Sequence, residues 1–180
     1  NGESQLNLNT QFTWLQFIGM KLFQVSDLPA PDSKRVAIRR NGQDLAQDTE
    51  EDYGSFVHLQ PLNSEFIDDK MQDDAQGNLY KKVRPDVNWA YRNGDLARYA
   101  RDGWGKQTNE SEDDWADLDE FLRIMNQADA DSDYIDQVEA VANLDQWMRW
   151  FAVETLIANG ETNASNGTDD DYSMYRGRLD

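Results

Sequence analysis

The chain has 180 residues, of which 38% are hydrophobic and 11% aromatic, a composition that can bury the core of one domain and argues against disorder. Its formal net charge of −18 at pH 7 argues against binding to nucleic-acid backbones, and the absence of cysteine excludes disulfides and thiolate metal sites. No apolar run reaches the roughly 20 residues of a membrane-spanning helix.

A helix is predicted near the start of the sequence, over residues 10–25. Thr10 is a suitable N-cap, and the helix must end before Pro29, because proline cannot continue it. Apolar residues recur at helical spacing and are expected to form the buried face. They are Trp14, Phe17, Ile18, Leu22 and Val25.

Short strands are predicted next. Residues 35–40 and 43–46 flank Asn41-Gly42, the preferred pair for a type I′ hairpin turn. Residues 53–60 indicate a third strand, which Pro61 ends. The first part of the chain, to about residue 60, is therefore expected to contain small antiparallel sheets and hairpins.

The remainder, from about residue 61 to 180, is predicted to be mainly helical. A short helix capped by Asn63 or Ser64 runs to about Met71, and residues 79–83 indicate a strand. Residues 84–110 are polar but rich in large rings, so an ordered, irregular segment is expected.

Two longer helices and a last strand complete the prediction. One helix carries an apolar stripe from Trp115 to Met125, the other spans residues 143–158, and residues 172–176 indicate a strand. Leu144, Trp147, Met148, Phe151 and Leu156 are expected to be buried. The fold class that follows is α+β, in a single domain.

Two acidic loops contain candidate metal ligands. Residues 129–133 match the first ligand positions of an EF-hand, but Tyr134 stands where glycine is needed and Ala140 where the bidentate glutamate belongs. A solvated acidic turn is the favoured interpretation, with weak Ca²⁺ binding as the alternative. Residues 159–171 gather carboxylates and amides that suit Mg²⁺ or Mn²⁺, although composition alone favours an acidic turn here too.

Three segments, in this order, resemble the CotH kinase family, which is named for a spore-coat protein. Residues 53–61 with Phe66-Ile67 are similar to the family's Gly-x-Tyr strand, its terminal Glu and the following helix. Gly77-Asn78-Leu79-Tyr80-Lys81 resembles a Gly-Asn-Leu-Tyr-Lys block, and residues 159–175 resemble the catalytic loop and the strand after it. The order and spacing of these segments carry the resemblance.

The resemblance implies a diverged protein-kinase-like fold that transfers the γ-phosphoryl group of ATP to a protein Ser or Thr with a divalent metal, Mg²⁺ or Mn²⁺. By position, Glu161 stands for the catalytic-loop Asp. Asp171 stands for the metal-holding Asn, with Asn166, Asp169 and Asp170 as neighbours that would share the metal.

The same resemblance suggests contacts to the nucleotide. Gln60, at the end of its strand, would lie near the adenine, and Phe56 or Tyr80 would offer a stacking face. Lys81 is the nearest basic residue in a matched block.

The chain departs from the family pattern at three of these positions, with Glu161 for Asp, Asp171 for Asn and Gln60 for Glu. It is expected to be incomplete at both ends, and a fragment of this length is expected to be inactive without the rest of a CotH-like protein.

The alternative is a non-catalytic, Ca²⁺-supported adhesion or scaffold module of a larger exported protein. Either reading implies a protein substrate or surface partner, no nucleic acid and no membrane span. The expected location is extracellular or at the cell surface or envelope.

Overall fold

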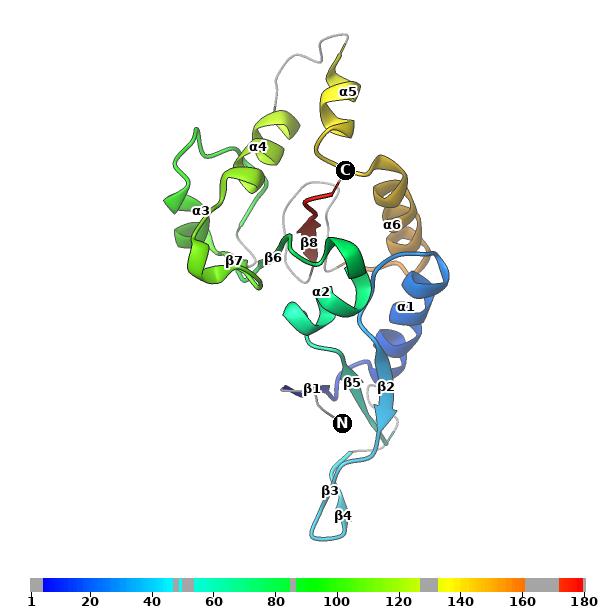
Figure 1. The fold of residues 1–180 in the computed structure, drawn as a ribbon. Helices are drawn as coiled ribbons and strands as arrows, with labels where there is room; N and C mark the ends of the chain where they lie inside the picture. The colour runs from blue at the N-terminus through cyan, green and yellow to red at the C-terminus, as the bar shows by residue number, and fades with distance from the viewer. Residues whose placement is uncertain are drawn as a thin grey trace. The chain divides into compact units, whose positions relative to one another are not determined.

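The structure is a computed structural model, and it describes residues 5–46, 49, 54–84, 87–126, 133–160 and 172–179. The chain forms two compact units, Asn1–Gln72 and Asp73–Asp180. Small antiparallel sheets and helices occur in both (Figure 1), which confirms the α+β class. Within the described ranges, no helix is long and apolar enough to cross a membrane.

The first unit contains a three-stranded antiparallel sheet. Strand β5 (Phe56–Leu59) lies between β1 (Asn7–Asn9) and β2 (Ser33–Val36). His58 of β5 is paired with Leu8 on one side and with Lys34 on the other. The central strand of this sheet is therefore the last of its three strands in the sequence. Helix α1 (Thr13–Val25) packs against β2 and β5. The core of this unit consists of Phe23, Leu28, Ala30, Val57, Leu59, Phe66 and Ile67.

The predicted buried face of α1 is wrong. Thr13, Gly19 and Phe23 are buried, whereas Trp14, Ile18 and Val25 are exposed. The helix is apolar around more than half of its circumference, so spacing alone does not select the stripe that the sheet covers. The N-cap position also lies two residues later than expected, at Phe12 in a left-handed conformation (φ 49°), so Thr10 is not the N-cap.

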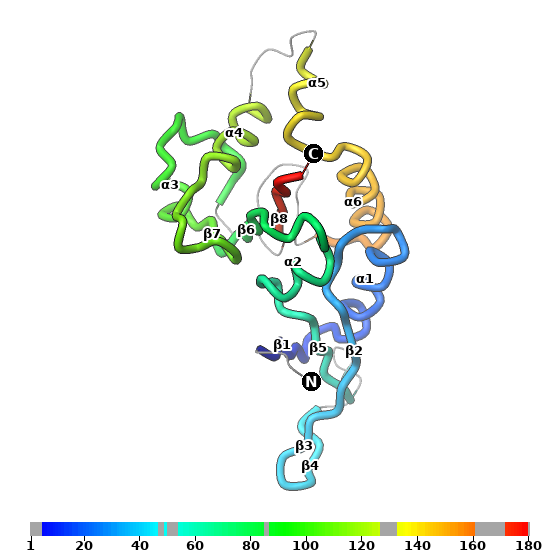
Figure 2. Tube along the Cα trace, viewed as in Figure 1, coloured from blue at the N-terminus to red at the C-terminus, as the bar shows by residue number. Residues whose placement is uncertain are grey.

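The hairpin turn and the short helix of the first unit are confirmed, but the strand predicted over residues 35–40 is divided into Ser33–Val36 and Arg39–Arg40, which belong to different sheets. Strands β3 (Arg39–Arg40) and β4 (Gln43–Asp44) flank Asn41 and Gly42, whose φ angles of 52° and 81° fit a type I′ turn. The hairpin extends beyond the end of β2, as Figure 2 shows. Helix α2 (Ser64–Met71) begins at Asn63, whose side chain accepts a 3.2 Å hydrogen bond from the N–H of Phe66.

The second unit is built on another three-stranded antiparallel sheet. Strand β6 (Asn78–Lys82) lies between β7 (Trp104–Lys106) and β8 (Ser173–Arg176). Its helical elements are α3 (Ala97–Asp102), α4 (Ala116–Met125), α5 (Tyr134–Glu139) and α6 (Leu144–Leu156), with short 3₁₀ turns at Gln72–Asp74 (η1, at the boundary between the units) and Glu110–Glu112 (η2). The core consists of Tyr80, Val87, Tyr99, Trp104, Trp115, Leu118, Phe121, Leu122 and Tyr172.

Residues 84–110 are more regular than predicted, because they contain α3 and β7. The left-handed Gly103 (φ 109°) ends α3, and Trp104 then pairs with Lys82 across the sheet. A strand of three residues that pairs with a distant partner leaves little signal in the local sequence. Its existence depends on the tertiary contact.

Two further predictions are wrong in the second half of this unit. Helix α5 was not expected; Tyr134 is its first residue, and residues 127–132 lie outside the described ranges. In α6, Met148 and Leu156 are 59% and 73% exposed, although burial was predicted for both. Trp147 and Phe151 are half-buried and Val153 is buried, because the core reaches only one narrow side of the helix.

Candidate functional site

The segment Gly77-Asn78-Leu79-Tyr80-Lys81, the block on β6 that matches the family pattern, begins at a glycine where the structure has no room for a side chain. A Cβ atom at Gly77 would lie 2.1 Å from the carbonyl oxygen of Arg176 and 2.6 Å from Tyr175 Oη. The backbone N–H of Gly77 donates a 2.8 Å hydrogen bond to Tyr175 Oη, and that hydroxyl donates to the carbonyl oxygen of Asp74. The glycine therefore permits the close approach of β8 to β6.

Asn78 and Tyr80 converge on one carboxylate in the first turn of α4. Asn78 Nδ2 donates to Asp117 Oδ2 at 2.8 Å, and Tyr80 Oη donates to Asp117 Oδ1 at 2.5 Å. The N–H of Leu118 donates to Oδ1 as well, at 2.8 Å. Burial, followed by the hydrogen bond to Asp117, raises the pKa of the Tyr80 phenol, so Tyr80 remains a neutral donor. The block is thus joined to α4 by hydrogen bonds.

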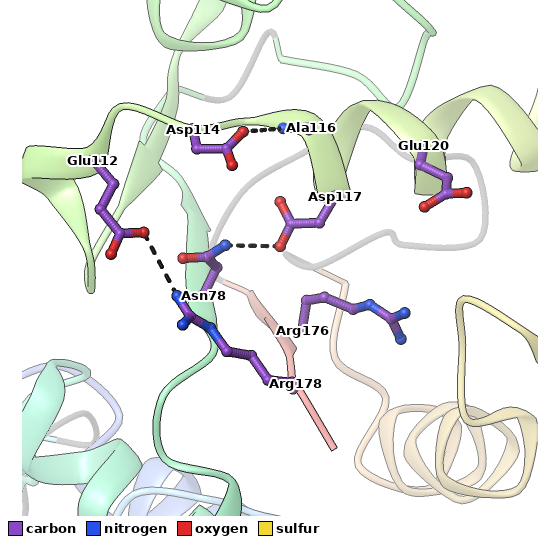
Figure 3. A pocket seen from close by; sticks show the side chains of 9 residues that line it. Asn78, Glu112, Asp114, Ala116, Asp117, Glu120, Arg176 and Arg178 are labelled. Atoms are coloured by element: carbon purple, nitrogen blue, oxygen red, sulfur yellow. Dashed lines mark hydrogen bonds and ion pairs between the residues drawn. The ribbon is translucent and has the colours of Figure 1, made fainter. Parts of the chain in front are cut away.

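A polar cavity of about 380 Å³ opens beside this cluster (Figure 3). Carboxylates of η2 and α4 line one side, and Arg176 and Arg178 from the end of β8 line another. Arg178 reaches Glu112 at 3.6 Å, whereas Arg176 extends in another direction. Asn78, Glu112, Asp114, Ala116, Asp117, Glu120, Arg176, Gly177 and Arg178 form the lining.

The cavity does not have the geometry of a metal centre. Across the described ranges, no three His, Asp or Glu side chains are grouped so that they would hold a metal ion. Both oxygens of Asp117 accept hydrogen bonds from the protein itself. Because both carboxylates and guanidinium groups line this cavity, it suits a ligand that carries both positively and negatively charged groups.

The core face of the sheet carries two buried lysines that sequence reasoning missed. Lys82 lies at the end of β6 with its Nζ 5.3 Å from the centre of the Tyr172 ring. Lys106 on β7 donates from Nζ to the carbonyl oxygen of Asp114 at 2.8 Å and lies 5.9 Å from the ring of Tyr80. The sequence did contain a signal for Lys82. Side chains alternate between the two faces of a strand, so residues 80 and 82 of β6 must share a face.

Two of the predicted nucleotide contacts lie on opposite faces of β6. Tyr80 is only 2% exposed, and its ring centre is 5.6 Å from that of Trp115, so a base would reach the ring only after this packing opened. Lys81 is half-buried on the other face, between Gly105 of β7 and Ser173 of β8. Both assignments remain predictions.

The other two predicted contacts, Phe56 and Gln60, belong to the first unit. Phe56 is half-buried in β5. Gln60 Oε1 accepts the N–H of Asp32 at 3.2 Å, and its Nε2 donates to Asp69 Oδ2 at 3.4 Å. The amide is therefore part of a structural network, and its contact with adenine stays a prediction.

Lys70 is the centre of this network, with Nζ 3.0 Å from Asp32 and 2.8 Å from Asp69. The hydrogen bond from Lys70 lowers the pKa of both carboxyls, and at Asp69 the bond from Gln60 adds to the effect. Partial burial lowers the pKa of Lys70, but the hydrogen bonds to Asp69 and Asp32 outweigh it, so the net shift is upward.

The predicted catalytic and metal-binding residues lie outside the described ranges. These are Glu161, Asn166, Asp170 and Asp171, together with the neighbouring Asp169. Gly160 is the last described residue before them, and Tyr172 is the first one after them.

A comparison with protein families finds a match to the family model described as CotH kinase protein, over residues 18–179. No curated protein matches the sequence.

Proposed function

The chain belongs to the CotH kinase protein family, and we propose that it is an atypical, kinase-like phosphotransferase. In this proposal it transfers the γ-phosphoryl group of ATP to a Ser or Thr of a protein, with Mg²⁺ or Mn²⁺ as the metal. Family membership is the observation that carries the proposal. A diverged kinase-like fold is part of the proposal, and the small sheets followed by helices support it.

The residues proposed for the metal have suitable chemistry. Asp171, Asp170 and Asn166 offer carboxylate and amide oxygens, the hard donors that Mg²⁺ prefers, and the metal would neutralise charge on the phosphates. Asp171 replaces the family's Asn, so this site carries one more negative charge. That charge would strengthen the attraction for a divalent cation.

Glu161 is proposed as the residue that orients the acceptor hydroxyl and takes up its proton. The hydroxyl oxygen forms a bond to the γ-phosphorus while the bond from that phosphorus to the departing ADP breaks. The side chain of glutamate is one methylene longer than that of aspartate, so the proposed carboxylate has a longer reach than the family's Asp.

One observation favours a second candidate, a non-catalytic module of the cell surface supported by Ca²⁺. At position 60 the family's Glu is replaced by Gln, and the amide is held between Asp32 and Asp69. Because the Gln60 side chain forms hydrogen bonds with both residues, its role is to stabilise the fold of the first unit. We propose an extracellular or envelope location for either function. The strong acidity of the chain favours it, and so does the resemblance to the CotH family.

Calorimetric titration of Mg²⁺·ATP into the full-length protein tests the first proposal. Asp171→Ala is expected to weaken metal-dependent nucleotide binding, and Glu161→Ala is expected to retain binding but to abolish phosphoryl transfer. Asp145→Ala, at the exposed start of α6, is the control for the loss of one carboxylate.

Two results would reject the kinase proposal. One is a folded, full-length protein that binds ATP with neither Mg²⁺ nor Mn²⁺. The other is turnover that is unchanged in Glu161→Ala. Ca²⁺-dependent binding to a surface partner without nucleotide binding would favour the second candidate.

A further inference from the structure

The polar cavity of the second unit is lined by more carboxylates than guanidinium groups. Its volume of about 380 Å³ lies within the range of small-molecule sites, roughly 300–1,000 Å³. Four carboxylates and two guanidinium groups line it, a surplus of two negative charges. The remaining lining residues are Asn78, Ala116 and Gly177, so the cavity offers little apolar surface. A ligand matched to this cavity is therefore small, strongly hydrophilic and, on balance, positively charged.

Asp117 supplies a carboxylate that is held in place but not neutralised. It is half-buried, and its donors are all uncharged: the amide of Asn78, the phenol of Tyr80 and the N–H of Leu118. Among the residues that the structure describes, no lysine or arginine forms an ion pair with it. Charges removed from water are normally paired. A cationic group in the cavity would supply this partner, and the three hydrogen bonds already fix the orientation of the carboxylate.

Two further carboxylates extend the acidic wall on either side of Asp117. Asp114 Oδ1 accepts the N–H of Ala116 at 3.0 Å, which orients its side chain at the start of α4. Lys106 donates to the backbone carbonyl oxygen of Asp114 and not to a carboxylate. Glu120 is exposed and lies three residues after Asp117, so the two side chains share a face of α4. Together these residues offer several anionic oxygens to a cationic ligand group.

Arg176 brings the opposite charge to the same cavity. It is the last residue of β8, it is exposed, and its guanidinium group has no acceptor within the described ranges, whereas Arg178 is paired with Glu112 at 3.6 Å. In the view of Figure 3 the Arg176 side chain extends below Asp117 and toward the side on which Glu120 lies. A guanidinium group binds a carboxylate through two parallel hydrogen bonds. An anionic ligand group is therefore expected at Arg176.

The two signs of charge distinguish between classes of ligand. A polyamine would satisfy the carboxylates but would bring like charge to Arg176. A dicarboxylate or inorganic phosphate would suit Arg176 but would be repelled by the acidic wall. A basic α-amino acid carries one carboxylate and two cationic groups. It matches both the presence of two signs and the surplus of negative charge in the lining.

We propose that this cavity binds a free basic α-amino acid. The α-carboxylate lies against Arg176, and the ammonium groups lie against Asp117 and its neighbours Asp114 and Glu120. Neither nucleotide nor metal takes part in this binding. The inference is therefore independent of the proposed phosphotransferase activity and is tested without it.

Calorimetric titration of the full-length protein with L-lysine at low ionic strength tests the inference, because salt screens exposed charges. Saturable binding is expected. Cadaverine keeps both amino groups of lysine but lacks the carboxylate, and Nα-acetyl-L-lysine amide represents a lysine inside a protein chain. Each is expected to bind about tenfold more weakly or worse, the loss of at least one charge-assisted hydrogen bond.

Variants of exposed lining residues assign the two ends of the ligand. Arg176→Gln is expected to weaken L-lysine binding about tenfold and to abolish the preference for lysine over cadaverine. Glu120→Gln is expected to weaken the binding of both compounds. Arg123→Gln on α4 and Glu139→Gln on α5 are matched controls, since both residues are exposed and lie outside the lining. Both controls are expected to keep the affinity of the wild type, and circular dichroism checks that all four variants are folded.

Each remaining result overturns the inference. The absence of saturable L-lysine binding does so directly. Equal affinity for lysine and cadaverine, or binding that survives Arg176→Gln, would remove the carboxylate contact on which the choice of an amino acid depends. Equal affinity for Nα-acetyl-L-lysine amide would assign the cavity to a lysine side chain of a protein segment instead. Nucleotide binding, measured in a separate titration, decides the proposed function whichever of these results is found.

Discussion

Tyr80 and Asp117 are 37 residues apart in the sequence and are joined by a 2.5 Å hydrogen bond from the phenol to Oδ1. The bond connects the central strand of the second unit to the first turn of α4. Asn78 donates to the other oxygen of the same carboxylate, so one aspartate receives two side chains of the matched block. This arrangement explains why polar residues occur in a strand that otherwise packs into the core.

Tyr80→Phe removes the bond and keeps the ring. We expect the free energy of unfolding to fall by about 1–3 kcal/mol, because the half-buried Asp117 carboxylate loses a hydrogen bond from the buried Tyr80. Urea unfolding followed by circular dichroism measures the change. Tyr134→Phe is the matched control, since the half-buried Tyr134 makes no hydrogen bond through its hydroxyl within the described ranges. Equal stability of the two variants would contradict the role of the bond.

Gly77→Ala introduces a Cβ atom 2.1 Å from the carbonyl oxygen of Arg176. One of the two strands must move, and we expect a loss of about 1–3 kcal/mol, as for other overpacked sites. Gly160→Ala is the control, because nothing lies within 4 Å of the added atom there. Thermal unfolding of both variants checks the prediction, which fails if Gly77→Ala melts with the wild type.

Alkaline pH is expected to unfold the second unit through its buried tyrosines. Burial raises the pKa of Tyr80, Tyr99 and Tyr172. In the unfolded chain these phenols ionise near pH 10. Below that pH both states are neutral and the contribution to stability is fully present; above it the unfolded chain loses protons first and stability falls.

The expected slope is about 1.4 kcal/mol per pH unit for each such tyrosine. Tyr80→Phe should therefore lose stability less steeply than the wild type above pH 10, although it starts from a lower value. Unfolding measured as a function of pH, together with the ultraviolet absorbance of tyrosinate, tests this. Parallel curves for the two proteins would show that Tyr80 does not titrate in the unfolding transition.

The Asp32–Lys70–Asp69 network gives the opposite dependence in acid. The pKa values of both carboxyls are lowered, so their contribution is present above the ordinary aspartate value of about 3.9 and is lost as pH falls through the folded values. The pKa of Lys70 is raised, so its contribution is present below about pH 10.4 and is lost above it.

Lys70→Met is therefore expected to cost about 0.2–1 kcal/mol near neutral pH, the range of partly exposed ion pairs, and almost nothing once both carboxyls are protonated in the folded protein as well. Lys34→Met, an exposed lysine of β2 without an ion pair in the described ranges, is the control. A difference between the wild type and Lys70→Met that is the same at neutral and at acid pH would exclude the network as its source.

Local sequence determined the features that depend on residues close together in the chain. Asn41-Gly42 predicted its hairpin because few residue pairs adopt positive φ readily, and Asn63 predicted a helix start because its side chain reaches an N–H three residues later. The strand at Asn78–Lys82 was predicted to within one residue. The order and spacing of the blocks were enough to indicate the family, which the match over residues 18–179 confirms.

Only the tertiary structure decided which side of each element faces the core. Helix α1 has more apolar residues than one face can bury, and the sheet covers Gly19 and Phe23 and leaves Trp14 exposed. The same is true of the candidate site: Lys81 and Lys82 are adjacent in the sequence, but pairing with Trp104 places Lys82 in the core. Asp117 becomes the partner of Tyr80 only because α4 returns to β6. Contacts between distant residues depend on how elements pack, and periodicity within one element carries no information about its neighbour.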